Sequence, residues 1–118
     1  MTQNRNHKSE RRKKYELEYS KIALKDLEDI MTYISINLQN PIAAENFAKE
    51  YDRKVNERRY NPLAFSKYQD NKKRKNIYYT LLVKNYTVFY IVKSDTMKIH
   101  RVIYSRRNFQ KLIWIQEF

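Results

Sequence analysis

The sequence of 118 residues contains no cysteine, no glycine and only two prolines. Without thiols the chain can form neither disulfides nor thiolate metal sites, and nothing in it points to an oxidising compartment. Without glycine it cannot contain a glycine-rich loop of the kind that cradles phosphates. These absences exclude a disulfide-stabilised scaffold and the common nucleotide-binding loops.

Long hydrophobic runs are also missing. No apolar stretch approaches the roughly 18 residues that a membrane span needs, and the N-terminus lacks the apolar segment of a secretory signal.

Histidine is scarce, with His7 and His100 only. The carboxylates of Asp26, Glu28 and Asp29 share one expected helix, where a solvated face is more common than a ligand cluster. We therefore expect a cytoplasmic protein that binds no metal and no cofactor.

Acidic residues become rare in the second half of the chain. Ten of the 13 Asp and Glu precede Arg58, and from Arg58 onward 14 Lys and Arg face only Asp70, Asp95 and Glu117. The formal net charge of the chain is +12. This segregation predicts a polyanionic partner, such as nucleic acid, an acidic protein or an anionic membrane.

The chain divides into a short arm and one domain. Residues 1–14, "MTQNRNHKSERRKK", are polar and basic and have no apolar periodicity, so we expect a disordered basic arm. Residues 15–118 suffice for one domain with one hydrophobic core, since 42% of the chain is apolar.

The first half of this domain predicts a strand and two helices. Residues 15–20, "YELEYS", alternate apolar and acidic side chains, which indicates a half-buried strand. Ser20 can cap a helix that runs to about Asn37, and Asn40 with Pro41 can start a second helix, limited by Asn61-Pro62. The short connection predicts antiparallel neighbours. Helical spacing relates Ala23, Leu24, Leu27, Ile30, Met31, Ile34 and Leu38, and also Ala44, Phe47, Ala48, Tyr51 and Val55.

The second half predicts three strands after an irregular segment at 61–76. We expect strands at 77–83, 86–92 and 97–104, the first two joined by a Lys84-Asn85 turn in which Asn tolerates positive φ. The middle strand, "YTVFYIV", is apolar on both faces and should be central in the sheet. Residues 107–115 can form a short helix or extend an edge.

The candidate functional residues are cationic. Arg106 and Arg107 directly follow the last expected strand, which should hold their backbone in place. From such a position guanidinium groups can bind phosphate bidentately. The loop residues Lys72, Lys73, Arg74 and Lys75 could add to the field, although a solvated loop explains them equally well. Tyrosines of the sheet could stack bases beside these cations, but for any single tyrosine a half-buried strand position is the preferred interpretation.

Four segments carry a family resemblance. They are "YELEYSKIALKDLEDIMTYI" at 15–34, "NPIAAENF" at 40–47, "LLVKNYTVFYIV" at 81–92 and "IHRVIYSRRN" at 99–108. In this order and spacing the sequence resembles the RelE/ParE superfamily, the toxins of bacterial type II toxin–antitoxin modules. The resemblance implies an α+β fold, in which a small twisted antiparallel β-sheet carries an N-terminal helical hairpin on one face. The implied order is β-α-α-β-β-β with a short C-terminal helix.

The resemblance also implies partners and two alternative targets. The toxin should bind an acidic cognate antitoxin and no membrane. RelE-like members cut mRNA in the ribosomal A site without metal, whereas ParE-like members poison DNA gyrase and are not enzymes. Ribosome-dependent mRNA cleavage is the hypothesis that we prefer from sequence; the alternatives are gyrase inhibition and a degenerate member that binds only antitoxin.

Cleavage would need a base, an acid and cations for the charge that develops on phosphorus. The resemblance implies that Arg107, with Arg106 beside it, would stabilise that charge. Proton transfer could fall to Tyr104, to His100 or to a loop lysine, and His100 could contact nucleic acid together with the loop cations. The sequence departs from the nuclease pattern, because basic residues commonly stand where this chain has Tyr78, Tyr79, Thr80 and Thr87, and a Tyr or His where it has Ile113, Trp114 and Ile115.

Overall fold

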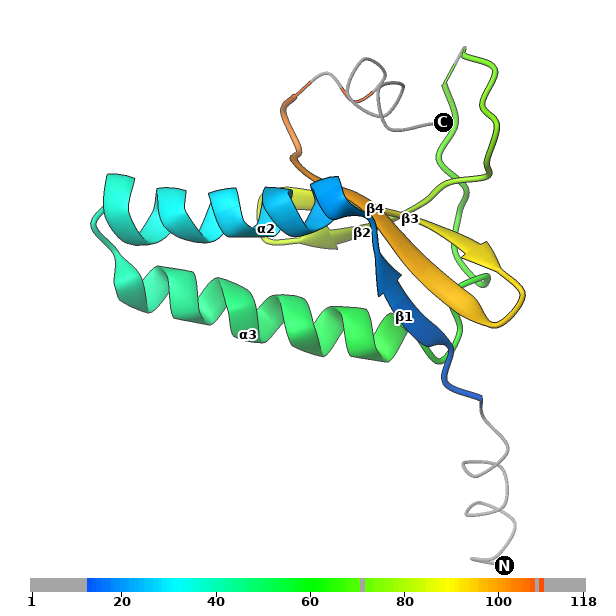
Figure 1. Cartoon of the computed structure of the whole chain (residues 1–118), viewed down its shortest axis with the longest axis horizontal. Helices are drawn as coiled ribbons and strands as arrows, with labels where there is room; N and C mark the ends of the chain where they lie inside the picture. Colours follow the sequence, from blue (N-terminus) through cyan, green and yellow to red (C-terminus); the bar gives the residue numbers. More distant parts are fainter. Residues whose placement is uncertain (1–12, 71, 108, 110–118) are drawn as a thin grey trace, which may run out of the picture.

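The computed structural model describes residues 13–70, 72–107 and 109. It is an α+β structure in which a helical hairpin covers one face of a four-stranded sheet (Figure 1). The expected order β-α-α-β-β-β is confirmed for the described residues. The elements are β1 (Glu16–Tyr19), α2 (Lys21–Thr32), the π-helical turn η1 (Tyr33–Asn37), α3 (Pro41–Arg58), β2 (Tyr79–Val83), β3 (Tyr86–Lys93) and β4 (Thr96–Tyr104).

Two expected segments fall largely outside the described part of the chain. These are the basic arm, of which residues 1–12 are not described, and the expected C-terminal element at 107–115, of which only residues 107 and 109 are described. No helix in the described ranges is both long and apolar enough to cross a bilayer.

Both helix caps predicted from sequence are present. The Ser20 hydroxyl accepts a hydrogen bond from the Ala23 amide (3.0 Å) and donates one to the His100 carbonyl (2.8 Å). The Asn40 side chain accepts from the Ala43 amide at 3.0 Å, and Pro41 is the first residue of α3. Because the Ser20 side chain also binds the backbone of β4, it both caps α2 and holds the N-terminal end of this helix against the sheet.

The first helix reaches Asn37 as expected, but its last turn is wider than an α-helix. The Leu38 amide donates to the Tyr33 carbonyl at 2.9 Å, which closes a π turn. Gln39 then takes a positive φ of 53° and reverses the chain toward α3. The closed end of the hairpin projects past the strands (Figure 1).

The strand order is β1-β4-β3-β2, and the sheet is mixed. The expectation of an antiparallel sheet holds for β2, β3 and β4, but β1 runs parallel to β4, with Glu16 opposite Thr96 and Tyr19 opposite Ile99. This pairing joins strands from opposite ends of the domain, so no turn or local pattern encodes it. In the Lys84-Asn85 turn the positive φ, 54°, belongs to Lys84 and not to Asn85.

The core has two layers. Between sheet and helices, Phe47, Tyr51 and Val55 of α3 pack with buried residues of the strands. On the opposite face lie Tyr78, Phe89, Ile91 and Ile103, against which Tyr68 and Phe109 pack. Side chains on both faces of β3 are therefore buried, as its sequence predicts for a central strand.

Candidate functional site

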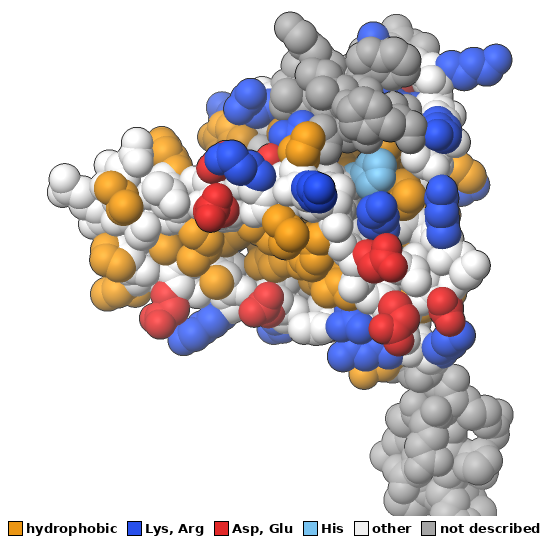
Figure 2. All heavy atoms as spheres, in the orientation of Figure 1, with side chains coloured by type: hydrophobic (Ala, Val, Ile, Leu, Met, Phe, Trp, Pro, Cys, Tyr) orange, Lys and Arg blue, Asp and Glu red, His pale blue; other side chains and the backbone are white. Residues whose placement is uncertain are grey.

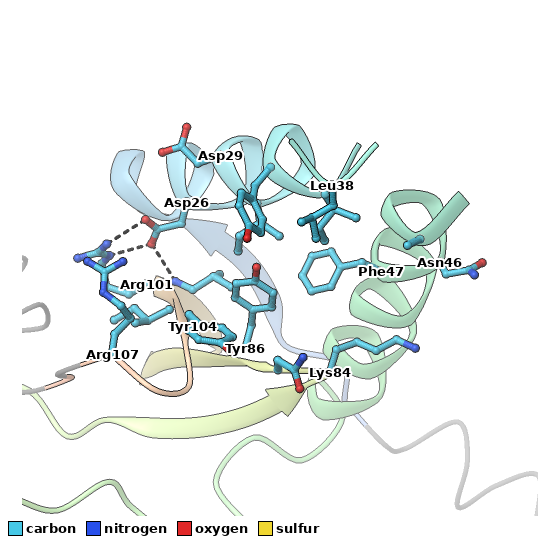
Figure 3. A pocket seen from close by; sticks show the side chains of 17 residues that line it. Asp26, Asp29, Leu38, Asn46, Phe47, Lys84, Tyr86, Arg101, Tyr104 and Arg107 are labelled. Atoms are coloured by element: carbon cyan, nitrogen blue, oxygen red, sulfur yellow. Dashed lines mark hydrogen bonds and ion pairs between the residues drawn. The ribbon is translucent and has the colours of Figure 1, made fainter. Parts of the chain in front are cut away.

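A groove of about 910 Å³ opens between the hairpin and the end of the sheet where β2 turns into β3 (Figure 3). Its helical wall is mostly apolar and includes Ile30, Tyr33, Leu38 and Phe47. Volumes of this size hold a ligand or several side chains of a partner. The π turn and the start of α3 form the rim, because Tyr33, Leu38 and Ala43 all line the groove.

The sheet wall is cationic and aromatic. Lys84 comes from the β2–β3 turn, Tyr86 from β3, and Tyr104 and Arg107 from the end of β4 and the turn after it. The rings of Tyr86 and Tyr104 meet edge to face, with centroids 5.6 Å apart. Burial raises the pKa of Tyr86, and the neighbouring Tyr33 and Tyr104 add to the rise, so its hydroxyl stays protonated at neutral pH.

One ion pair fixes the wall beside α2. The Asp26 carboxylate accepts hydrogen bonds from Arg101 Nε (2.8 Å), Arg101 Nη2 (2.9 Å) and the Val102 amide (2.9 Å). The two side chains are 11% and 14% exposed. Asp26 thus departs from the solvated face expected for the helix carboxylates. Its charge is matched, so it is not a free base.

The other carboxylate in the groove is also paired. Asp29 binds Lys25 one helical turn earlier at 2.8 Å, and this hydrogen bond raises the pKa of Lys25. Among the described residues, no three His, Cys, Asp or Glu side chains are grouped so that they could hold a metal ion.

The structure separates the two arginines predicted from sequence. The Arg107 amide donates to the Tyr104 carbonyl at 2.9 Å in a tight turn, and both side chains line the groove. Arg106 is exposed and does not line it. Figure 3 shows Arg107 at the same end of the groove as Arg101, with Lys84 at the other end. The structure therefore brings Arg107 and Tyr104 together and leaves Arg106 outside.

His100 lies in the interior. It is 8% exposed, its Nδ1 atom lies 2.9 Å from the Tyr78 hydroxyl, and it is not part of the groove wall. This position is unlike the surface contact with nucleic acid that sequence reasoning considered for it.

The loop cations do not act as one group. Lys72, Lys73 and Lys75 are exposed, whereas Arg74 is an ion-pair partner of Asp70 in a nearly buried position. Burial alone would raise the pKa of Asp70, but hydrogen bonds from Arg74 and from the Lys72 amide outweigh it and hold the pKa low. Arg74 therefore helps to shape the loop, and none of these four residues is among those lining the groove.

Sequence reasoning missed most of the groove. It did not single out Lys84, Tyr33 or Leu38. One signal was available, since residues 30–44 contain no charged side chain in a chain that is 32% charged. A charge-free stretch at a helix–helix connection predicts a surface that meets another apolar surface.

Comparisons with known proteins agree with this architecture. A family model described as "ParE toxin of type II toxin-antitoxin system, parDE" matches residues 17–109. The chain belongs to the ParE toxin family. A solved chain titled "Chromosomal ParDE TA system from P. aeruginosa" superposes on this ParE-family toxin with a TM-score of 0.62 and 16% identity, covering 76% of this chain and 95% of that one. No curated protein matches the sequence significantly.

The match confirms the superfamily resemblance and narrows it to one branch. At 16% identity the solved structure shows a common fold and nothing finer. This ParE-family toxin is thus the toxin component of a type II toxin–antitoxin system of the ParDE type, which makes an antitoxin its partner.

Proposed function

We propose that this ParE-family toxin arrests growth by binding DNA gyrase and inhibiting it, as a binding protein and not as an enzyme. The observation that carries the proposal is the family match over residues 17–109, because the ParE branch is the one associated with gyrase. The groove adds support, since an apolar cleft with exposed Arg107 and Lys84 at its two ends suits a macromolecular partner. Both toxin and gyrase would act in the cytoplasm.

The chemistry of the groove is in keeping with a non-enzymatic role. RNA cleavage needs a group that removes a proton and another that supplies one. The two groove carboxylates are engaged by Arg101 and Lys25, and His100 lies outside the groove.

One observation favours mRNA cleavage as a second candidate. Arg107 and Tyr104 line the same groove, so a guanidinium for phosphate and a phenol for proton transfer are close to each other. In this alternative Arg107 would stabilise the charge on phosphorus and Tyr104 would move the proton.

The cationic half of the chain supports an acidic antitoxin. From Arg58 onward Lys and Arg outnumber Asp and Glu by 14 to three. A field of this sign accelerates encounter with an acidic protein and weakens as salt is added. We propose that this charge guides the antitoxin to the toxin.

Two assays on the purified chain separate the candidates. DNA supercoiling by gyrase and mRNA integrity on translating ribosomes are measured over the same range of toxin concentration. We expect loss of supercoiling while the mRNA stays intact. Cut mRNA with undiminished supercoiling would establish the second candidate instead. Antitoxin binding with neither effect would identify a degenerate member.

A further inference from the structure

Positive charge is concentrated in the second half of the described chain. Residues 60–107 contain eleven Lys and Arg but only two acids, Asp70 and Asp95. Both acids are held in ion pairs, Asp70 with Arg74 and Asp95 with Lys13. Among the described side chains, Figure 2 shows most Lys and Arg over the sheet and its loops and none at the free end of the hairpin. The acids of this half therefore leave its positive field largely uncancelled.

Five of these cations form a surface here called the basic patch. They are Lys67, Lys72, Lys73 and Lys75 of the segment between α3 and β2, and Arg106 of the turn after β4. All five are exposed, and none forms an ion pair with another described residue. The exposed acids of β1, Glu16 and Glu18, pair with the first half of β4 and so lie at the other end of that strand from Arg106.

Aromatic contacts hold the two segments of the patch side by side. Phe89 lies in the core layer on the face of the sheet away from the helices. The rings of Tyr68 and Phe109 pack on it edge to face, with centroids 5.2 and 4.9 Å from its own, and meet each other at 6.3 Å. Both segments leave the strands in the same direction in Figure 1. The loop and the turn therefore present their cations on one face of the molecule.

The loop that carries the lysines is built around an interior ion pair. The Asp70 and Arg74 side chains are 4% and 9% exposed, and Asp70 also accepts a hydrogen bond from the Lys72 amide at 3.0 Å. The Tyr68 amide donates to the Tyr78 carbonyl at 2.7 Å and attaches the loop next to β2. Because the backbone is held in place, the lysines lose less conformational entropy when they meet a partner.

The composition of the patch favours nucleic acid over an acidic protein. Four of its five cations are lysines, and lysine is depleted from protein–protein interfaces. Lysine and arginine are, in contrast, the main side chains that contact the phosphates of DNA. The aromatic rings of this face are unsuited to stacking on the bases of a single strand, because Phe89 and Tyr78 are 0% and 1% exposed. The ligand chemistry that fits is therefore the backbone of a duplex.

We propose that the basic patch binds the sugar–phosphate backbone of duplex DNA without reading its sequence. A duplex carries one negative charge for about every 1.7 Å of its axis, so several phosphates meet the loop and the turn at once. Release of the condensed counterions supplies the binding free energy. In the cell the patch meets the duplex that gyrase holds, and this choice of duplex rests on the proposed function. The binding itself requires no gyrase.

Fluorescence anisotropy of a labelled DNA duplex of mixed sequence measures the binding. The purified full chain is added free of antitoxin and gyrase. At physiological salt we expect a Kd in the micromolar range. The plot of log Kd against log salt concentration should have a slope of about 4, because roughly 0.9 counterion is released for each phosphate that the patch cations neutralise.

Three charge-matched variants show whether the patch carries the binding. Lys73→Glu and Arg106→Glu place one change in each segment of the patch. Each should raise the Kd about fivefold or more at physiological salt, because attraction to phosphate becomes repulsion. Lys49→Glu makes the same change of charge at an exposed position of α3 and should leave the Kd nearly unaltered. Circular dichroism verifies that all three variants keep the fold.

Several results would overturn the proposal. No binding at physiological salt would do so directly. Equal effects of Lys49→Glu and the two patch variants would show that net charge alone attracts the DNA. Tighter binding of a single strand or of an RNA duplex would reject duplex DNA as the partner. Loss of antitoxin binding in Lys73→Glu, with the affinity for DNA intact, would assign the patch to an acidic protein.

The gyrase proposal and the DNA proposal fail separately. A toxin that binds the duplex through the patch and leaves supercoiling undiminished would lose gyrase inhibition as its function and keep the DNA contact. A toxin that inhibits gyrase while Lys73→Glu and Arg106→Glu leave the Kd for DNA unchanged would keep the function and lose the contact.

Discussion

Asp26 and Arg101 lie 75 positions apart in sequence and form a two-point ion pair that joins the first helix to the last strand. The same carboxylate accepts the Val102 amide at 2.9 Å, on the stretch of β4 that extends beyond its pairing with β1. One side chain thus orients a cation of the groove wall and satisfies a backbone donor at the strand edge.

Loss of Asp26 should therefore be costly. Asp26→Ala leaves a mostly buried guanidinium and a backbone amide without their acceptor, so we expect the free energy of unfolding to fall by about 3 kcal/mol. Urea denaturation followed by circular dichroism measures this change. Asp29→Ala, which removes an exposed carboxylate from the same helix, is the control and should change stability little. Equal losses in both variants would mean that the Asp26 contact contributes no more than a surface pair.

Arg107 provides a test of the groove's role in toxicity. Arg107→Ala should abolish growth arrest and leave the unfolding midpoint unchanged, because the side chain is exposed and its removal uncovers no core. Induced expression without antitoxin, scored by colony counts, gives the readout. Arg53→Ala on the outer surface of α3 is the matched control and should stay toxic. Undiminished arrest by Arg107→Ala would remove this residue from the functional surface.

The Arg58 side chain should stabilise the packing of the segment that follows α3 against the sheet. Its guanidinium carbon lies 3.4 Å from the centroid of the Phe65 ring, and its Nη1 donates to the Thr80 carbonyl and to the Tyr90 hydroxyl, each at 2.8 Å. The Tyr90 hydroxyl in turn donates to the Pro62 carbonyl at 2.7 Å. Arg58→Met keeps the aliphatic stem but loses the stacking and both hydrogen bonds, for an expected loss of about 2–3 kcal/mol in denaturant titration.

A lysine at this position should restore little of that stability. A planar guanidinium lies flat on an aromatic ring, whereas a compact ammonium cannot stack in this way and keeps only its capacity to donate hydrogen bonds. Arg53→Met, on the exposed face of the same helix, should unfold close to the natural midpoint. If Arg58→Lys is as stable as the natural chain, the stacking argument is wrong.

Buried tyrosines predict loss of stability in alkali. Burial raises the pKa of Tyr51 far above its ordinary value of 10.0. Burial is also the main reason why the pKa values of Tyr90 and of Tyr19, which is hydrogen-bonded to Tyr51, are raised. The folded state then keeps protons that the unfolded chain releases. Stability should be intact below pH 10 and fall progressively above it, as the pH rises toward the folded-state values.

Denaturant titrations at a series of pH values measure this slope. Tyr51→Phe removes one of the groups concerned and should make the decline above pH 10 shallower, at the cost of the Tyr19–Tyr51 hydrogen bond at neutral pH. A free energy of unfolding that stays level through pH 10 and beyond would contradict the account.

Local chemistry made much of the fold predictable. Ser20, Asn40 and Pro41 act within a few residues of the helices they start, and the continuous apolar run of β3 corresponds to its burial on both faces. Such signals depend on neighbours in sequence, so one chain is enough to interpret them. They located both helices and all four strands closely.

The candidate site could not be predicted in the same way, because it is formed by contacts between segments far apart in the sequence. The parallel pairing of β1 with β4, the Asp26–Arg101 pair and the burial of His100 against Tyr78 each join segments far apart in sequence. The resemblance selected Arg107 with Arg106 as its neighbour, but the residue pattern alone does not show which of the two lines the groove; the structure places Arg107 in the groove wall and leaves Arg106 outside it. No spacing rule carries this information.

The position of β4 between β1 and β3 has a consequence during synthesis. β1 leaves the ribosome early, yet β4, the strand with which it pairs, is translated much later. Until then its backbone edge is unmatched and the groove lacks the wall that β4 supplies. We therefore expect that a chain released before β4 has been translated cannot form the complete groove.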